Sequence, residues 1–202
     1  MDMETIELRY GNTKTYLIKG EKGNLLVDTD MPGTMSAFFK EIKCHSLQVS
    51  DISFVLATHF HPDHMGLIGN LMDMGVSLVL IDIQKGYVQC WEQRIGSYPI
   101  DVKSAKVITV GESRSFLQSL GIHGEIIHTP SHSMDSICVT LDDGICIAGD
   151  LSPLSYLQVE PETSQLRDDW NLILSHNPKK VLFAHTNTME FNDSRFEGFY
   201  TI

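Results

Sequence analysis

Hydrophobic residues along the chain follow two kinds of pattern. Short apolar runs bounded by turn residues are typical of β-strands. In a few longer segments the apolar residues instead recur every three or four positions, as on one face of a helix. The short runs predict strands at residues 5–10, 15–20, 24–29, 52–58, 76–82, 105–110, 124–129, 136–141, 144–149 and 179–185. The helical spacing predicts helices at residues 33–47, 63–75 and 162–178.

Two stretches follow neither pattern. Residues 84–104 mix aromatic and polar side chains and predict an irregular or partly helical excursion, and residues 187–202 have no clear period. Within the excursion, Tyr87, Trp91 and Tyr98 fit the wall of a substrate pocket and a small separate core equally well. Both interpretations stay open at this point.

The order of the elements bears on the fold class. Strands dominate and helices are inserted at intervals, which favours two packed sheets with helices on their outer faces over a purely parallel sheet. A chain of 202 residues that is 42% hydrophobic can bury a sizeable core. We expect one domain spanning residues 1–202.

The net charge and the cysteines indicate which binding partners and which cellular compartment to expect. A formal net charge of −11 makes nucleic acid a poor partner, because an acidic surface repels phosphates. The N-terminus lacks the basic and apolar regions of a signal peptide, and no apolar run is long enough to span a membrane. Cys44, Cys90, Cys138 and Cys146 show no CxxC spacing. We expect a cytoplasmic protein with reduced cysteines, in which Cys138 and Cys146 are buried thiols.

The stretch "THFHPDH" follows the apolar run at 52–58 directly. His59 and His61 are two residues apart and face the same way in an extended chain. Pro62 helps to turn the chain into the next helix, whose first turn carries Asp63 and His64. Neutral imidazole and carboxylate groups both suit zinc and similar metals. This density of donors indicates a metal site rather than a polar surface corner.

Three further apolar runs are each followed by a residue that can bind a metal. "EIIHTPSHS" offers His132, while His128 is better explained as a hydrogen-bonded structural residue. "ICIAGD" offers Asp150, after a glycine that permits close backbone approach. "VLFAHT" offers His185. Donors that each follow a strand are expected to meet at one edge of the sandwich.

The ordered set "HFHPDH", "TPSHS", "GD" and "AHT" resembles that of the metallo-β-lactamase-fold hydrolase superfamily, over nearly the whole chain. The resemblance implies an α+β fold, a four-layer αββα sandwich. It also implies a site for two divalent metal ions, with zinc as the preferred metal and iron or manganese as alternatives. Asp28 would lie behind the ligands and support them. One metal would take His59, His61 and His132, the other Asp63, His64 and His185, and Asp150 would bridge them.

The sequence departs from the family pattern near the third histidine. The family usually has TPGHTxGS there, whereas this chain has "TPSHSMDS", so that Ser131 and Asp135 replace glycines. Lactonases of this fold place a tyrosine three positions after the bridging aspartate. Here Pro153 has that position and Tyr156 follows three residues later, which argues against a phenol donor.

Two adjacent metals lower the pKa of a shared water and polarise a carbonyl or phosphoryl oxygen, so a bridging hydroxide is the expected nucleophile. Asp63 and Asp150 are the expected catalytic carboxylates. The lack of an export signal and the presence of Asp150 argue against a true β-lactamase. The short segment after His185 leaves no room for the helical domain of glyoxalase II.

What remains is a compact member of the glyoxalase II and lactonase-like branch, acting on an ester, thioester or lactone of a small molecule. Three alternatives stay open. The first is a phosphodiesterase with the same metals. The second is a persulfide-dioxygenase-like oxidoreductase that binds one iron through two histidines and an aspartate. The third is a metal-binding module without catalysis.

Overall fold

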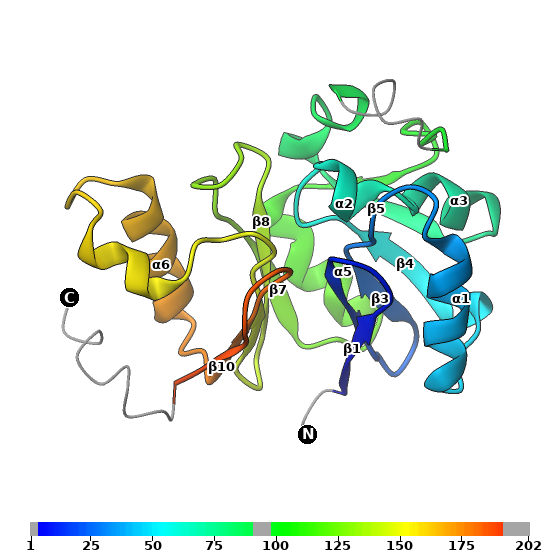
Figure 1. Ribbon diagram of the computed structural model, residues 1–202, viewed down its shortest axis with the longest axis horizontal. Helices are drawn as coiled ribbons and strands as arrows, with labels where there is room; N and C mark the ends of the chain where they lie inside the picture. The colour runs from blue at the N-terminus through cyan, green and yellow to red at the C-terminus, as the bar shows by residue number, and fades with distance from the viewer. Residues whose placement is uncertain (1–3, 91–97, 192–202) are drawn as a thin grey trace.

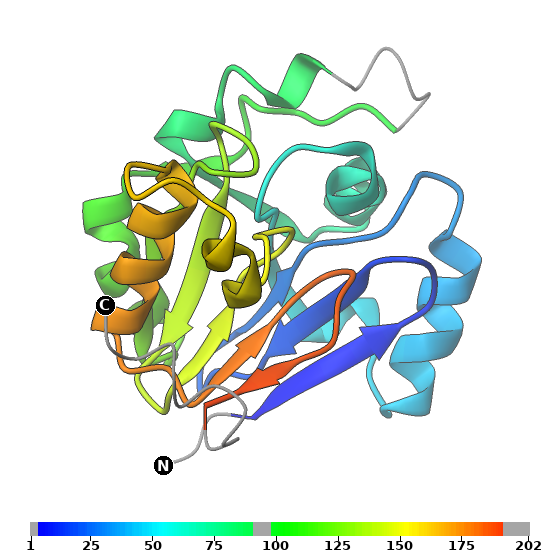
Figure 2. The same cartoon turned by 60° about the vertical axis from the view of Figure 1, so that its left-hand side comes forward.

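The computed structural model describes residues 4–90 and 98–191, and its strands form two sheets that pack face to face (Figures 1 and 2). The first sheet has the strand order β1-β2-β3-β4-β5-β6. Its strands are β1 (Thr5–Arg9), β2 (Lys14–Ile18), β3 (Asn24–Val27), β4 (Ile52–Leu56), β5 (Ser77–Ile81) and β6 (Lys106–Ile108). β1 to β3 are antiparallel to one another, whereas β3 to β6 run parallel.

The second sheet has the order β11-β10-β9-β8-β7. Its strands are β7 (Gly124–His128), β8 (Ile137–Leu141), β9 (Ile145–Ile147), β10 (Lys180–Leu182) and β11 (Met189–Glu190). β9 and β10 are parallel, and the other neighbours are antiparallel. Because β4 in one sheet and both β9 and β10 in the other end near the same edge, the residues that follow them can meet there.

Helices cover the outer faces of both sheets. The helices are α1 (Met35–Cys44), α2 (Pro62–Met65), α3 (Ile68–Asp73), α5 (Ser113–Ser119) and α6 (Gln165–Ser175). The described residues also form the 3-10 turns η1 (Val49–Asp51), η2 (Asp82–Gln84), η3 (Val110–Glu112) and η4 (Leu154–Gln158). α1 and α3 lie against the first sheet and α6 against the second, while the short α2 lies at the upper end of the sheets in Figure 1.

Alternation along the strands divides the core into three parts. On β3, Leu25 and Val27 point into the core between the sheets, and Leu26 points into the core beneath α1. On β10, Leu182 faces the central core, and Val181 faces the core beneath α6. A strand buried on both faces needs apolar residues on both, which explains its continuous apolar run. The layers are helix, sheet, sheet and helix, and the predicted αββα sandwich is confirmed.

Three elements differ from the sequence prediction. The expected helix 63–75 is two helices, because Leu67 donates its N–H to the side chain of Thr29 and Gly66 lies against the backbone of residues 30–32. Tertiary contacts therefore replace helical hydrogen bonds at this point. α5 and β11 were not predicted, and both are short elements whose few residues provide little periodic signal.

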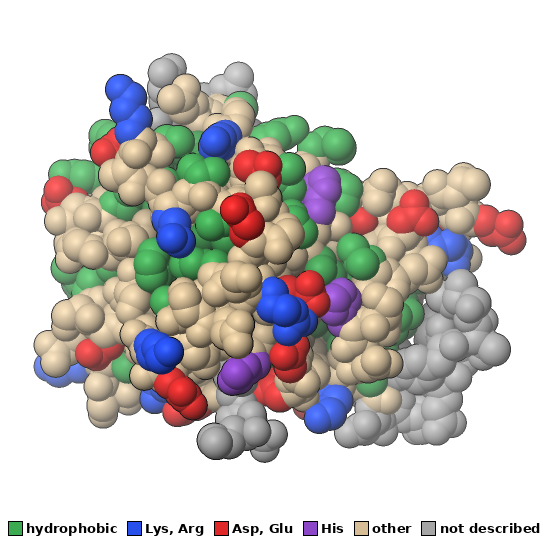
Figure 3. Space-filling view, turned by 180° about the vertical axis from the view of Figure 1, so that it is seen from behind, with side chains coloured by type: hydrophobic (Ala, Val, Ile, Leu, Met, Phe, Trp, Pro, Cys, Tyr) green, Lys and Arg blue, Asp and Glu red, His purple; other side chains and the backbone are tan. Residues whose placement is uncertain are grey.

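The described residues also show the character of the surface and the state of the cysteines. The part of the chain that the structure describes has no helix that combines the length and apolar character needed to cross a bilayer. On the face in Figure 3, acidic and basic side chains are interspersed without a continuous basic stripe. All four cysteines are free thiols, and Cys138 and Cys146 are buried as predicted.

Candidate metal centre

All seven predicted metal-binding residues lie together at one end of the sandwich. Their ligand atoms form three overlapping groups, and within each group these atoms are all within 4.8 Å of one another. The groups are His59, His61 and His132; Asp63, His64 and His185; and His59, His64 and Asp150. We call the first the three-histidine group and the second the Asp63 group. His128 is in none of them and instead contacts the carbonyl of Met134 at 2.9 Å.

Asp150 stands between the two groups, and its two oxygens face different sides. Oδ1 is 3.3 Å from Nε2 of His64 and 3.3 Å from Nε2 of His185. Oδ2 is 3.7 Å from Nε2 of His132 and 4.0 Å from Nε2 of His59. A carboxylate with one oxygen toward each group can link two cations, because each oxygen can bind a different one.

Burial and local charge decide which histidines are neutral. Burial and the neighbouring histidines hold the pKa of His59 far below its ordinary value, and burial also lowers the pKa of His132. Burial alone would lower the pKa of His64 too, but the carboxylates of Asp28 and Asp150 raise it to about 10. A protonated His64 balances the charge of these carboxylates. A metal cation at Nε2 would take the place of that proton, since metal ligands must be deprotonated.

The charge of Asp150 is itself stabilised. Burial would raise the pKa of Asp150, but its interactions with neighbouring histidines, above all His64, hold that pKa below the ordinary value. The carboxyl group is therefore ionised at neutral pH, which is the form that binds metals.

The donor set fits a metal cation. Nε2 of His59 is 3.0 Å from Nδ1 of His61, which is 3.2 Å from Nε2 of His132. Imidazole nitrogens this close need a proton or a cation between them, because lone pairs repel. Nε2 of His64 and Oδ1 of Asp150 are buried, and although they lie 3.3 Å apart, neither has a hydrogen bond of good geometry among the described residues. Such atoms are costly unless an ion or another group pairs with them.

Asp28 contacts both His64 and Thr58. Its Oδ2 is 3.0 Å from Nδ1 of His64, which directs Nε2 of the same ring toward Asp150. Asp28 also accepts hydrogen bonds from the N–H and the hydroxyl of Thr58, at 2.6 and 2.8 Å. Its φ of 63° is unusual for a residue other than glycine, and these contacts hold it there.

Thr58 contacts Asp28 and one histidine of each group, the three-histidine group and the Asp63 group. Its hydroxyl is 3.2 Å from Nδ1 of His59 and 3.4 Å from Nδ1 of His64. A Cβ at Gly149 would lie 2.4 Å from this hydroxyl, and Gly149 has a φ of 54°. Glycine is therefore required where the chain brings Asp150 over Thr58.

The two residues that depart from the family pattern have contacts of their own. The buried carboxylate of Asp135 accepts the N–H of Phe60 at 2.8 Å and a hydrogen bond from Ser133, so it ties the loop of His132 to the loop of His61. The N–H of Ser131 donates to the buried Asp169 on α6 at 2.8 Å. The loop that carries the third histidine is thus held from both sides.

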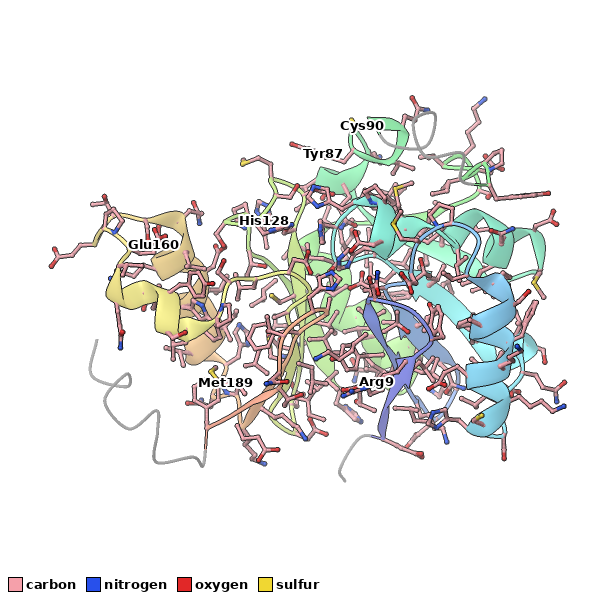
Figure 4. The ribbon with its side chains drawn as sticks, viewed as in Figure 1. Arg9, Tyr87, Cys90, His128, Glu160 and Met189 are labelled. Atoms are coloured by element: carbon pink, nitrogen blue, oxygen red, sulfur yellow. The ribbon has the colours of Figure 1, made fainter. Side chains whose placement is uncertain are left out.

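A pocket of about 240 Å³ adjoins the Asp63 group. It is lined by Gly149, Asp150, Leu151, Ser152, Pro153, Tyr156, Phe183, His185 and Thr186. Tyr156 thus lies beside the centre. Tyr87, above the sheets in Figure 4, packs on the core beneath α1, and Tyr98 lines a separate cleft at α3. Trp91 lies outside the described residues.

Sequence reasoning missed the residues that position the donors. Thr58, Asp135 and Asp169 are polar residues whose hydrogen-bond partners lie far away in the sequence. The one available signal was local: a threonine directly before the first histidine, and an aspartate where the family has a glycine.

Comparison with known proteins shows which family the chain resembles. The family model of the metallo-beta-lactamase superfamily matches residues 8–185. A beta-lactamase-like protein 2 homolog of Drosophila melanogaster is 22% identical over 190 residues, which cover 88% of this chain and 60% of that protein. The atrochrysone carboxyl ACP thioesterase of Claviceps purpurea is 29% identical over 134 residues, covering 66% of this chain and 37% of that protein. This chain spans less than two thirds of either relative.

Solved structures share the fold at low identity. The B3 metallo-beta-lactamase BLEG-1 has a TM-score of 0.68 and 16% identity, covering 94% of this chain and 95% of that one. A metallo-beta-lactamase family protein of Thermus thermophilus has a TM-score of 0.65 and 16% identity, covering 94% of this chain and 74% of that one. With its family match extending from β1 to His185, the chain belongs to the metallo-beta-lactamase superfamily.

Proposed function

We propose that this protein is a metal-dependent hydrolase that cleaves an ester, thioester or lactone of a small molecule in the cytoplasm. It belongs, in this proposal, to the glyoxalase II and lactonase-like branch of the superfamily. The three-histidine group and the Asp63 group would each hold one divalent ion, with zinc as the preferred metal. Asp150 would be a ligand shared by the two ions.

The observation that carries the proposal is the position of the Asp150 carboxylate. Oδ1 faces His64 and His185, and Oδ2 faces His132 and His59. Its negative charge offsets the repulsion between two dications. A site for one iron, held by two histidines and an aspartate, would use three of these seven donors and leave four without a metal.

A bound pair of divalent ions supplies a water of lowered pKa and polarises the carbonyl under attack. The chain's own residues orient the reaction. Asp28 fixes the ring of His64, and Asp63 contacts Nε2 of His185 at 3.0 Å. Asp63 and Asp150 are the carboxylates of this donor set, and we assign to them the orientation of the attacking water.

The pocket beside the Asp63 group favours an uncharged acyl or alkyl group over a phosphodiester. Its lining offers Leu151, Pro153, Tyr156 and Phe183 as apolar surface, with the acidic Asp150 at the centre. Among the described residues, no lysine or arginine side chain lines it, whereas phosphate sites commonly use such cations. The match to a protein named as an ACP thioesterase supports a thioester in particular.

Metal analysis followed by a substrate panel tests the proposal. Purified protein should hold about two metal ions per chain and hydrolyse aryl esters, thioesters or lactones, and a chelator should abolish turnover until metal is restored. Preferential hydrolysis of bis-aryl phosphates would indicate a phosphodiesterase instead. One iron per chain with oxygen uptake on a persulfide would indicate the oxidoreductase. Two bound metals with no turnover across a broad panel would favour a binding module.

A further inference from the structure

A second aspartate lies two residues after Asp28, in the loop that follows β3. Asp30 is 1% exposed, and its carboxylate contacts the backbone of two segments. Oδ2 accepts the N–H of Asn12 at 2.9 Å, and Oδ1 accepts the N–H of Met31 at 2.7 Å. A Cβ at Gly11 would lie 1.2 Å from Oδ2, so the carboxylate rests directly on the backbone of residues 10–13. A buried carboxylate in this position organises that loop.

The same loop, residues 10–13 between β1 and β2, contacts the Asp63 group at two points. The carbonyl of Asn12 accepts a hydrogen bond from Nδ1 of His185 at 3.2 Å. The hydroxyl of Thr13, a residue 1% exposed, donates to Oδ2 of Asp63 at 3.4 Å. The loop therefore contacts one histidine and the one carboxylate of this group.

The contact with Asn12 settles how the His185 ring can act. A carbonyl only accepts hydrogen bonds, so Nδ1 carries a proton, and Nε2 is the nitrogen that can bind a cation. Nε2 lies 3.0 Å from Asp63 and 3.3 Å from Asp150, inside the centre. Partners of this kind orient metal-binding imidazoles and raise their basicity.

We propose that Asp30 is the positioning residue of the Asp63 group, acting through Asn12 and Thr13 on His185 and Asp63. The inference rests on the proposed function, since it concerns the second of the two metal positions. Asp28 and Asp30 then divide the support between them: Asp28 holds His64 and Thr58, and Asp30 holds the loop that contacts His185 and Asp63.

Asp30→Asn is the informative variant because it keeps the shape of the side chain. Both carboxylate oxygens accept backbone N–H groups, whereas an amide presents one acceptor and one donor. One N–H would face an NH₂ group, and the loop would shift. Asp169→Asn is the matched control: Asp169 is similarly buried and also accepts a backbone N–H, but beside His132 in the three-histidine group.

The experiment titrates zinc into chelator-treated protein against a competing chelator and counts bound metal by elemental analysis. Wild type should bind about two ions. Asp30→Asn should keep one site at wild-type affinity and weaken the other about 10–100-fold. Asp169→Asn should leave the Asp63 group's site at wild-type affinity. Thr13→Val should show the same selective loss of affinity at one site, whereas Thr13→Ser, which keeps the hydroxyl, should bind both ions as wild type does. This pair tests the inference even if Asp30→Asn folds poorly.

Each other outcome decides against the inference. If Asp30→Asn and Thr13→Val both bind zinc at two sites with wild-type affinity, the loop does not position the site. Equal weakening of both sites, with a lower melting temperature, would show that Asp30 only stabilises the fold. A wild-type protein that binds fewer than two ions would contradict the proposed function itself, and the inference with it.

Discussion

Oδ2 of Asp28 lies 3.0 Å from Nδ1 of His64, and both side chains are almost completely buried. This contact orients the ring, so we expect Asp28→Ala to weaken metal binding or turnover about 10–100-fold. Zinc titration of the chelator-treated variant measures the loss. Asp28→Asn is the control for backbone conformation, because asparagine also tolerates positive φ. Wild-type metal affinity and turnover in Asp28→Ala would show that Asp28 serves only the conformation of the turn.

Gly149 should tolerate no side chain. Alanine there would place Cβ 2.4 Å from the hydroxyl of Thr58, at a φ of 54°. Gly33 has a φ of 91° with nothing within 4 Å of an added Cβ, so Gly33→Ala shares the backbone strain without the clash. We expect Gly149→Ala to be less stable than Gly33→Ala by about 1–3 kcal/mol, the usual cost of overpacking. Denaturant unfolding measures the difference, and equal losses would show that the contact with Thr58 relaxes freely.

The stability of the chelator-treated protein should fall as the pH rises above neutrality. Burial would lower the pKa of His64, but Asp28 and Asp150 raise it from 6.5 to about 10. A raised pKa means that the folded chain holds this proton more tightly than the unfolded chain does. Its contribution is complete below about pH 6.5 and is lost as the pH approaches 10.

His64→Gln isolates this contribution. Melting temperatures of wild type and variant, both treated with chelator, should converge between about pH 7 and pH 10. Parallel curves over that range would mean that His64 does not hold the proton.

Tyr156 lines the pocket beside Asp150 and is 54% exposed. We expect Tyr156→Ala to raise KM roughly fivefold, which corresponds to about 1 kcal/mol of lost aromatic contact, with metal content unchanged. Tyr156→Phe retains the ring and should behave like wild type. A fall in kcat for Tyr156→Phe would instead give the hydroxyl a part in the chemistry.

The positions of the seven donors could be predicted from sequence because each donor lies in a segment that follows an apolar run, and each of these runs forms a strand. Strand ends at one edge bring such residues together, whatever the details of packing. The layers could be predicted for a similar reason, since Leu25, Leu26 and Val27 alternate between two cores that both require apolar side chains.

The contacts of the positioning residues could not be predicted from apolar runs, and Asp28 itself was expected only because the family resemblance implied it. Asp28 meets Thr58 across 30 positions, and Asp135 meets Phe60 across 75. No periodic pattern encodes such a pair, because the contact depends on how two loops approach one another. The break between α2 and α3 has the same origin, since Thr29 takes the N–H of Leu67 that a continuous helix would use.

Asp150→Ala, compared with wild type, tests most directly whether two metals act together here. The variant lacks the carboxylate that faces both groups, while the apolar core that holds the sandwich is untouched. The measurement is elemental analysis of both proteins alongside their rates on the best ester or thioester. We predict about two ions per chain in wild type, and in Asp150→Ala the loss of most of the second ion and most of the turnover. A single iron in wild type, or an unchanged rate in the variant, would contradict the account.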